Sequence, residues 1–442
     1  MTIVSDTPSP KPRAAGMGFI MLAVLIDMIS IGLIIPVLAP LVTSFAHSPR
    51  EQTAAMLAVS LAFGAANFVG SPILGALSDR YGRRRIMLVG FSGLALSFFV
   101  TSVATALWQL VLVRIFSGAM QANVAVANAY VADITAPQDR AKRFGMLGAA
   151  FGMGFILGPV LGGLLGDPQT QLPFGLRGDL HVPFVVAGTL AVLNWLYGYF
   201  VLPESLPPAR RSTHMDWRKA SPLSVFARLA QLRGVGSLVW VVALSGLAQL
   251  ILQSSWVLYT QHKFGWTPRD NGWALFAVGV LAVVVQGGLL RPLLKVFSVP
   301  QLAMAGLASA VVSNLLWGAA TAGWVMYVAI GVGLLAYAAG PALQSHISNA
   351  ADARRQGETM GALSSLNSLM AVMAPLLGMG LMYLVADLPR DDWRVGAPFY
   401  LCALLQAASL AACWVHFKHE AQAPAHIAPD AAVSPAAPPT QP

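Results

Sequence analysis

Long apolar stretches alternate with short polar segments along almost the whole chain. Each stretch has about 20 residues or more, the length an α-helix needs to cross the ~30 Å hydrocarbon core of a bilayer. The pattern predicts an all-α polytopic membrane protein with twelve transmembrane helices. The predicted spans are residues 18–45, 53–77, 86–105, 107–133, 143–166, 182–202, 236–260, 271–290, 300–320, 322–346, 358–384 and 396–417.

Composition agrees with a membrane protein, since 56% of the residues are hydrophobic and only 10% are charged. The net charge of +9 would suit a nucleic-acid-binding protein if the chain were soluble. If both termini are cytoplasmic, most of the 27 Lys and Arg residues instead fall in segments on the cytoplasmic side of the membrane. The positive charge therefore indicates membrane orientation, with both termini in the cytoplasm, and no nucleic-acid partner is expected.

A weak internal repeat divides the spans into two sets of six. Gly145, Pro159 and Gly162 recur 216 residues later as Gly361, Pro375 and Gly378. Two parallel six-helix halves related by a pseudo-two-fold axis are typical of transporters. The expected organisation is a disordered cytoplasmic tail at 1–16, an N-terminal half at 17–202, a cytoplasmic linker at 203–235, a C-terminal half at 236–420 and a disordered tail at 421–442.

The segment 75–85, GALSDRYGRRR, cannot lie in the hydrocarbon core, because each charged side chain would cost roughly 2.5–3.5 kcal/mol there. It is therefore predicted to be a tight aqueous loop between two membrane helices. The segment resembles the loop signature of the major facilitator superfamily, G-x-x-x-D-R-x-G-R-[RK]. The matching residues are Gly75, Asp79, Arg80, Gly82, Arg83 and Arg84.

Two further motifs extend this resemblance. In the fifth span the matching residues Gly154, Gly158, Pro159, Gly162 and Gly163 resemble the signature of drug/proton antiporters in the superfamily. In the fourth span Arg114-x-x-x-Gly118 resembles a third signature, and the nearest subgroup is the tetracycline-efflux-like antiporters. The resemblance implies a monomeric transporter of the inner membrane, which works by alternating access, moves protons and a small molecule, and needs no cofactor beyond the proton gradient.

Asp27 is the only acidic residue placed deep inside a predicted span. Desolvation opposes ionisation of a carboxyl group there, so it can exchange its proton for a substrate. The alternative is a protonated Asp that bonds a neighbouring helix. Arg114 is the expected partner, because its estimated depth differs from that of Asp27 by only about 7 Å.

Polar residues mark the faces of other spans. Arg114, Gln121 and Asn128 are spaced by seven, which places them on one face of an unbroken helix. Gln249, Gln253 and Trp256 form a similar stripe on the seventh span, and Tyr337 with Gln344 a weaker one on the tenth. The resemblance implies that the first, fourth, seventh and tenth helices line the substrate cavity. The alternative is hydrogen bonding between helices.

The loop at 75–85 is expected to act as a cytoplasmic gate. Asp79 would face the N-terminus of the eleventh helix near Gly357, where a carboxylate is stabilised by the helix dipole. Asp133 would pair with Arg80 or Arg84. The alternative is an anchor that only fixes topology. The fifth-span glycines allow close helix packing, and in addition they could seal the outer side against leakage.

Other chemistry is not indicated by the sequence. There is no phosphate-binding loop, no metal-ligand set and no Ser/His/Asp arrangement, so the chain is not expected to be an enzyme. The favoured function is proton-coupled efflux of a drug-like or bulky small molecule. The alternatives are a major facilitator importer or facilitator of a metabolite, and a non-transporting membrane sensor or scaffold. Tetracycline is one candidate substrate, although residues 90–105 lack the acidic residue that tetracycline exporters carry in the third span.

Overall fold

The protein is described by a computed structural model that covers residues 15–121, 123–136, 139–175, 177–212, 236–341, 343 and 356–422. Within these ranges the structure is helical, with one isolated β-bridge between Gln171 and Arg177. The α-helices are α1 Ala15–Thr43, α2 Pro49–Tyr81, α3 Arg83–Ser102, α4 Leu107–Met120, α5 Asn123–Ile134, α6 Arg140–Gly166, α7 Val182–Val201, α10 Gly236–Phe264, α11 Pro268–Val283, α12 Leu290–Val296, α13 Val299–Ala319, α14 Gly323–Val332, α16 Gln356–Val385 and α17 Ala397–Gln422.

Twelve helices among the described residues are long and apolar enough to cross a membrane, which confirms the predicted number of spans. Two spans are less regular than a hydropathy pattern can reveal. The fourth is broken between α4 and α5, because Gln121 leaves the helical conformation with φ −85° and ψ 54°. The eighth passes from α11 through a π-helical segment, Val284–Leu289, into α12.

Several helices begin with a side-chain cap that the sequence supplies. Ser48 accepts a hydrogen bond from the Glu51 amide at the start of α2. Thr267 and Asp270 form a reciprocal capping box at the start of α11. These caps satisfy backbone N–H groups that would otherwise have no partner where the chain enters the membrane.

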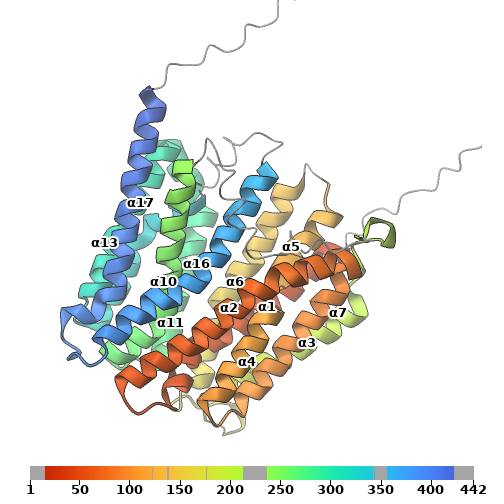
Figure 1. Cartoon of the computed structure of the whole chain (residues 1–442), viewed down its shortest axis with the longest axis horizontal. Coiled ribbons are helices and arrows are strands. Elements are labelled where there is room, and N and C mark those ends of the chain that lie inside the picture. Colours follow the sequence, from red (N-terminus) through yellow and green to blue (C-terminus); the bar gives the residue numbers. More distant parts are fainter. Residues whose placement is uncertain are drawn as a thin grey trace, which may run out of the picture.

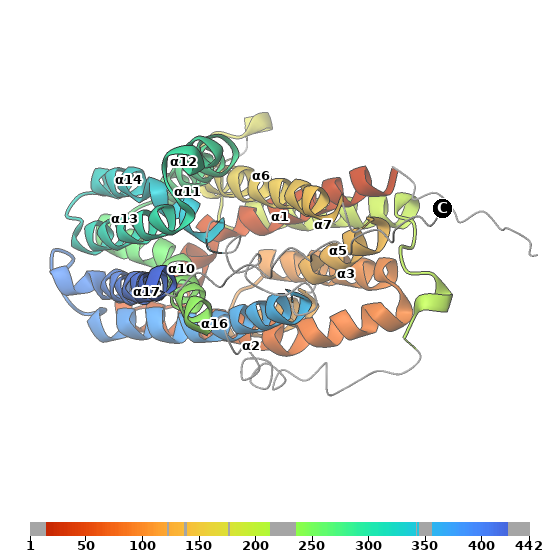
Figure 2. The same ribbon diagram turned by 90° about the horizontal axis from the view of Figure 1, so that it is seen from above.

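The helices form two groups that lie side by side, α1 to α7 and α10 to α17 (Figures 1 and 2). In the first group α1 packs against α6 and α7, and α2 packs against α4. In the second group α10 packs against α16 and α17. Two extensive contacts connect the groups, namely α6 with α11 and α2 with α16.

We call the end of the bundle that carries residues 79–85 the signature end, and the end that carries residues 43–49 the far end. Contacts between the two groups run from the middle of the helices to the far end. At the far end Gln261 Nε2 donates to Thr43 Oγ1 at 3.1 Å, and Arg50 Nε lies 2.7 Å from Asp387 Oδ2. Nearer the middle, a Cβ atom at Gly64 would lie 3.1 Å from the Ala371 carbonyl oxygen.

Glycines of α6 near the signature end have open surroundings. A Cβ atom at Gly145, Gly148 or Gly152 would meet no atom within 4 Å. Among the described residues, the two groups are therefore joined at the far end and in the middle of the helices.

Candidate functional site

The predicted loop between the second and third spans is a single-residue turn. Helix α2 continues to Tyr81 and α3 begins at Arg83, so only Gly82 separates them. Gly82 has φ +99°, a conformation that glycine adopts without the steric cost that a Cβ atom brings. The prediction of a tight loop is confirmed, and the turn fixes Asp79 and Arg83 in adjacent helical turns.

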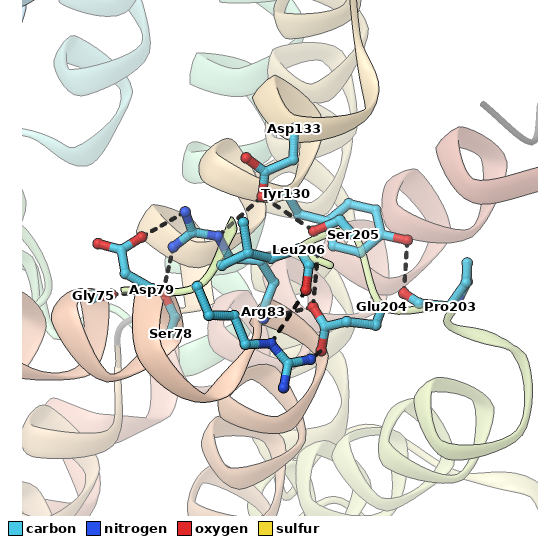
Figure 3. Close-up of polar contacts among 11 residues, drawn as sticks. Gly75, Ser78, Asp79, Arg83, Tyr130, Asp133, Pro203, Glu204, Ser205 and Leu206 are labelled. Atoms are coloured by element: carbon cyan, nitrogen blue, oxygen red, sulfur yellow. Dashed lines mark hydrogen bonds and ion pairs between the residues drawn. The ribbon is translucent and has the colours of Figure 1, made fainter. Parts of the chain in front are cut away.

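Arg83 is the centre of a polar cluster at this turn (Figure 3). Its side chain is largely buried, and Nη2 lies 2.6 Å from Asp79 Oδ1. Its Nε donates to Asp133 Oδ2 at 3.1 Å, and its Nη1 donates to Ser78 Oγ at 2.6 Å. One guanidinium thus connects α2, α3 and α5 and pairs with two carboxylates.

The expected pairing of Asp133 with Arg80 or Arg84 is wrong in this structure. Arg80 lies over the Tyr81 ring, with its Cζ atom 5.3 Å from the ring centroid. Arg84 donates to the Tyr199 carbonyl on α7. Successive residues of a helix point about 100° apart. At the start of α3, Arg83 therefore points toward Asp79 and Asp133, and Arg84 points toward α7.

The beginning of the linker also belongs to this cluster, which the sequence did not reveal. Glu204 Oε1 accepts a hydrogen bond from the Arg83 amide at 2.8 Å, where α3 begins. Ser205 Oγ donates to Asp133 Oδ2 at 3.2 Å, and Tyr130 Oη donates to the Pro203 carbonyl at 3.0 Å. A carboxylate directly after the sixth span was the available signal, because carboxylates favour helix N-termini.

The described contacts of Asp79 are with α3 and with the linker segment that follows α7. Besides its ion pair with Arg83, its carbonyl accepts a hydrogen bond from the Ser212 amide at 3.0 Å. The expected contact of Asp79 with the start of the eleventh helix stays a prediction, since residues 344–355 lie outside the described ranges.

Asp27 lies in α1 and is only 4% exposed. Its described partner is Asn123, whose Nδ2 donates to Asp27 Oδ1 at 3.4 Å. Asn123 is the first residue of α5 and is itself buried. It packs against Gly90 of α3, where a Cβ atom would lie 2.9 Å from the Asn123 Cγ atom. Sequence reasoning missed Asn123, although a polar residue inside the apolar fourth span was an available signal.

The expected pairing of Asp27 with Arg114 is also wrong in this structure. Arg114 is 8% exposed, and its Cζ atom lies 5.9 Å from the centroid of the Phe63 ring on α2. The expectation rested on depth alone, and a similar depth in the membrane does not fix the direction in which a side chain points. The predicted stripe of Arg114, Gln121 and Asn128 required one unbroken helix, whereas the chain leaves the helical conformation at Gln121. Gln121 ends α4, and Asn128 is half-buried in α5.

The stripe predicted on the seventh span divides into two parts. Gln249 and Gln253 are exposed on α10. Trp256 is 4% exposed and packs in an aromatic cluster, with its ring centroid 5.4 Å from that of Trp317. Trp256 therefore belongs to the packed core of the second group. Tyr337 is half-buried against an apolar cluster that includes Leu302, and Gln344 lies outside the described residues.

The fifth-span glycines place α6 between α1 of the first group and α11 of the second. A Cβ atom at Gly158 would lie 2.5 Å from the Gly32 Cα atom of α1. A Cβ atom at Gly163 would lie 2.5 Å from the Pro268 carbonyl oxygen at the start of α11. Pro159 contributes to the same surface, because a Cβ atom at Gly272 of α11 would lie 2.7 Å from the Pro159 carbonyl oxygen. The motif thus forms a main contact between the two groups.

In the described ranges no group of three or more His, Cys, Asp or Glu side chains is arranged to hold a metal ion. The polar features of the site are the Arg83 cluster at the signature end and the buried side chains of Asp27, Asn123 and Arg114 within the spans.

Comparison with known proteins gives consistent results. A family model described as Major Facilitator Superfamily matches residues 20–375. The class C tetracycline resistance protein of Escherichia coli is 34% identical over 389 residues, covering 86% of this chain and 93% of that protein. Multidrug resistance protein 2 of Bacillus subtilis is 28% identical over 409 residues, covering 90% and 95%. The crystal structure of the human organic anion transporter MFSD10 superposes with a TM-score of 0.67 at 23% identity, covering 92% of this chain and 100% of that one.

Proposed function

Because the chain belongs to the major facilitator superfamily of transporters, which are not enzymes, we propose that it exports a drug-like or other bulky small molecule in exchange for protons. The names of its relatives support export, since they include tetracycline and multidrug resistance proteins. In this proposal the two groups of helices are the two halves of an alternating-access transporter.

The observation that carries the proposal is the environment of Asp27. The carboxyl group is 4% exposed inside α1, and its described polar partner is the neutral amide of Asn123. No basic side chain among the described residues forms an ion pair with it. A buried carboxylate without a counter-ion is costly, and protonation relieves that cost. Such a group can bind a proton when the substrate leaves and release it when the substrate enters.

The proposed orientation places the signature end and both termini in the cytoplasm, with the chain in the inner membrane as a monomer. The positive charges of Arg80, Arg83, Arg84 and Arg85 then lie on the cytoplasmic side, as the positive-inside rule requires. Because the halves are joined at the far end, the described conformation is then closed toward the outside. In this proposal the Arg83 cluster holds the first half rigid and gates the cytoplasmic side while the halves move.

The proposal is tested in inverted membrane vesicles that contain the chain and hold an acidic lumen. Adding a transported compound should release lumenal protons, which a pH-sensitive dye reports, and an uncoupler should stop uptake of the compound. A susceptibility panel in an efflux-deficient host, including tetracycline and cationic dyes, selects the compounds. Vesicles without the chain are the control. Uptake that persists after uncoupling, or a panel in which no compound is exported, would contradict the proposal.

A further inference from the structure

Arg114 is a buried cation whose charge no described residue balances. It lies in α4 and is 8% exposed. Its side chain has no ion pair and no hydrogen-bond acceptor among the described residues, and the described contact of its guanidinium is the face of the Phe63 ring, at 5.9 Å.

The neighbouring helices offer no counter-ion at this depth. Helix α4 packs against α2 and α3, and the charged residues of both helices lie at the helix ends. They are Arg50, Glu51, Asp79 and Arg80 on α2, and Arg83, Arg84 and Arg85 on α3. The buried carboxylate of Asp27 is engaged by Asn123. Charged side chains inside a span are normally paired, so the missing partner of Arg114 points to a ligand.

We propose that Arg114 and Phe63 form a binding site for an ionised acidic group carried on an aromatic or apolar scaffold, so that the substrates of this transporter are organic anions. The planar guanidinium presents five donors in a fork that matches a carboxylate or an enolate. Phe63 supplies an apolar face beside it. This inference rests on the proposed function and adds the charge of the substrate to it.

The site lies next to a contact between the two halves. Gly64, the residue after Phe63, packs against the backbone of α16 at Ala371. On the other side of Phe63, a Cβ atom at Gly118 of α4 would lie 3.1 Å from the Ala66 Cβ atom of α2. An anion held by Arg114 would therefore lie where α2 contacts both α4 of the first half and α16 of the second half. Its binding would be sensitive to the relative position of the halves.

Paired probes test the charge directly. Naphthaleneacetate and its neutral amide, naphthaleneacetamide, share one ring system and differ in charge, and benzoate with benzamide forms a second pair. Calorimetric titration of the purified full-length chain, at a pH where the acids are ionised, measures binding of each. The wild type should bind the acids about tenfold or more tightly than the amides. Equal binding of acid and amide, or no binding of either acid, would overturn the proposal.

Substitutions test whether Arg114 is the source of the preference for acids over amides. Arg114→Gln should bind acid and amide equally, and Arg114→Lys should keep part of the preference because it keeps the charge. Arg291→Gln, which removes an exposed arginine on α12, should keep the full preference. Undiminished preference in Arg114→Gln would also overturn the proposal.

Asp27→Asn separates this inference from the proposed function. It should lose proton-driven transport and keep the preference for acids. If Asp27→Asn lost transport while the wild type bound acids and amides equally, proton coupling would stand and the anion site would fail. If the acid preference held while transport needed no proton gradient, the anion site would stand and the coupling would fail.

Discussion

Asp27 and Asn123 form a side-chain pair between α1 and α5, enclosed by apolar helices. A hydrogen bond from the amide favours the ionised carboxyl group, whereas burial favours the protonated one. The balance between these opposing effects determines the pH at which the group exchanges its proton. Asn123 is therefore expected to set the working pH of the transporter without carrying a proton itself.

Removing the amide should change this balance in a defined direction. Asn123→Ala deletes the donor, so the ionised form of Asp27 loses stabilisation and holds its proton to higher pH. The pH of half-maximal exchange, measured in inverted vesicles, should rise by about one to two units, since a hydrogen bond to a charged group contributes about 1.5–3 kcal/mol and one unit equals about 1.4 kcal/mol.

Asn314→Ala is the matched control for this change. Asn314 is a buried asparagine in the second half, and its Nδ2 donates to the Ala310 carbonyl of its own helix. The substitution should lower stability without moving the pH profile. A profile of Asn123→Ala that coincides with the wild type would show that the amide has no part in proton exchange.

Sequence reasoning located the buried charges but not their partners. A charged residue inside an apolar stretch is visible without a structure, and both Asp27 and Arg114 are buried as expected. Their pairing depended on helix geometry. The break between Met120 and Asn123 lies within a continuous apolar stretch, so hydropathy could not reveal it. Beyond the break Asn123 lies beside Asp27, whereas Arg114, before the break, lies against Phe63.

At the scale of elements, α6 depends on glycine for its approach to α1. A Cβ atom at Gly158 would collide with the Gly32 backbone, which cannot rotate away as a side chain can. Gly158→Ala should therefore destabilise the protein by about 1–3 kcal/mol, the usual cost of overpacking. Thermal unfolding of the detergent-solubilised chain measures the effect.

Gly148→Ala gives the comparison within the same helix. A Cβ atom at Gly148 meets nothing within 4 Å, and alanine is the better helix former. This substitution should be neutral or slightly stabilising. Equal loss of stability in the two variants would mean that the contact with α1 is not the reason for glycine at 158.

The linker segment 203–212 is a second element whose position the structure explains. Glu204 accepts hydrogen bonds from the amides of Arg83 and Leu206, which fixes the segment beneath the start of α3. Glu204→Ala should release the segment, so trypsin should cut after Arg210 or Arg211 several times faster. Asp392→Ala, which removes the partner of Arg394 in a loop at the far end, should leave this rate unchanged. Unaltered cleavage in Glu204→Ala would show that the carboxylate does not hold the linker.

For the whole molecule, the sequence predicted twelve spans and the structure has twelve helices able to serve as spans. The apolar pattern alone carries this information, because the bilayer fixes the length of each span. The conformation could not be predicted in this way. Alternative states of a transporter share one hydropathy pattern and differ only in which ends of the helices touch.

The contacts at the far end must break during the transport cycle if the halves rock. Arg50 and Asp387 are both exposed, so their ion pair is worth about 1 kcal/mol or less and can open readily. Joining Arg50→Cys and Asp387→Cys with a reducible bifunctional thiol reagent should stop transport, and reduction should restore it. Each single-cysteine variant is a control, and the native Cys402 and Cys413 are buried. Undiminished transport in the cross-linked protein would exclude opening at this end.

The central claim is that Asp27 couples proton entry to substrate exit. An amide of nearly the same shape cannot bind and release the proton, so Asp27→Asn isolates the charge from the packing. The most direct measurement is substrate accumulation in inverted vesicles after a pH jump, for the wild type and Asp27→Asn at equal membrane levels. We predict that the wild type accumulates substrate against its gradient, while Asp27→Asn only equilibrates it, with binding that no longer depends on pH. Accumulation by Asp27→Asn with normal proton dependence would contradict the account and make Asp133 the next carboxylate to test.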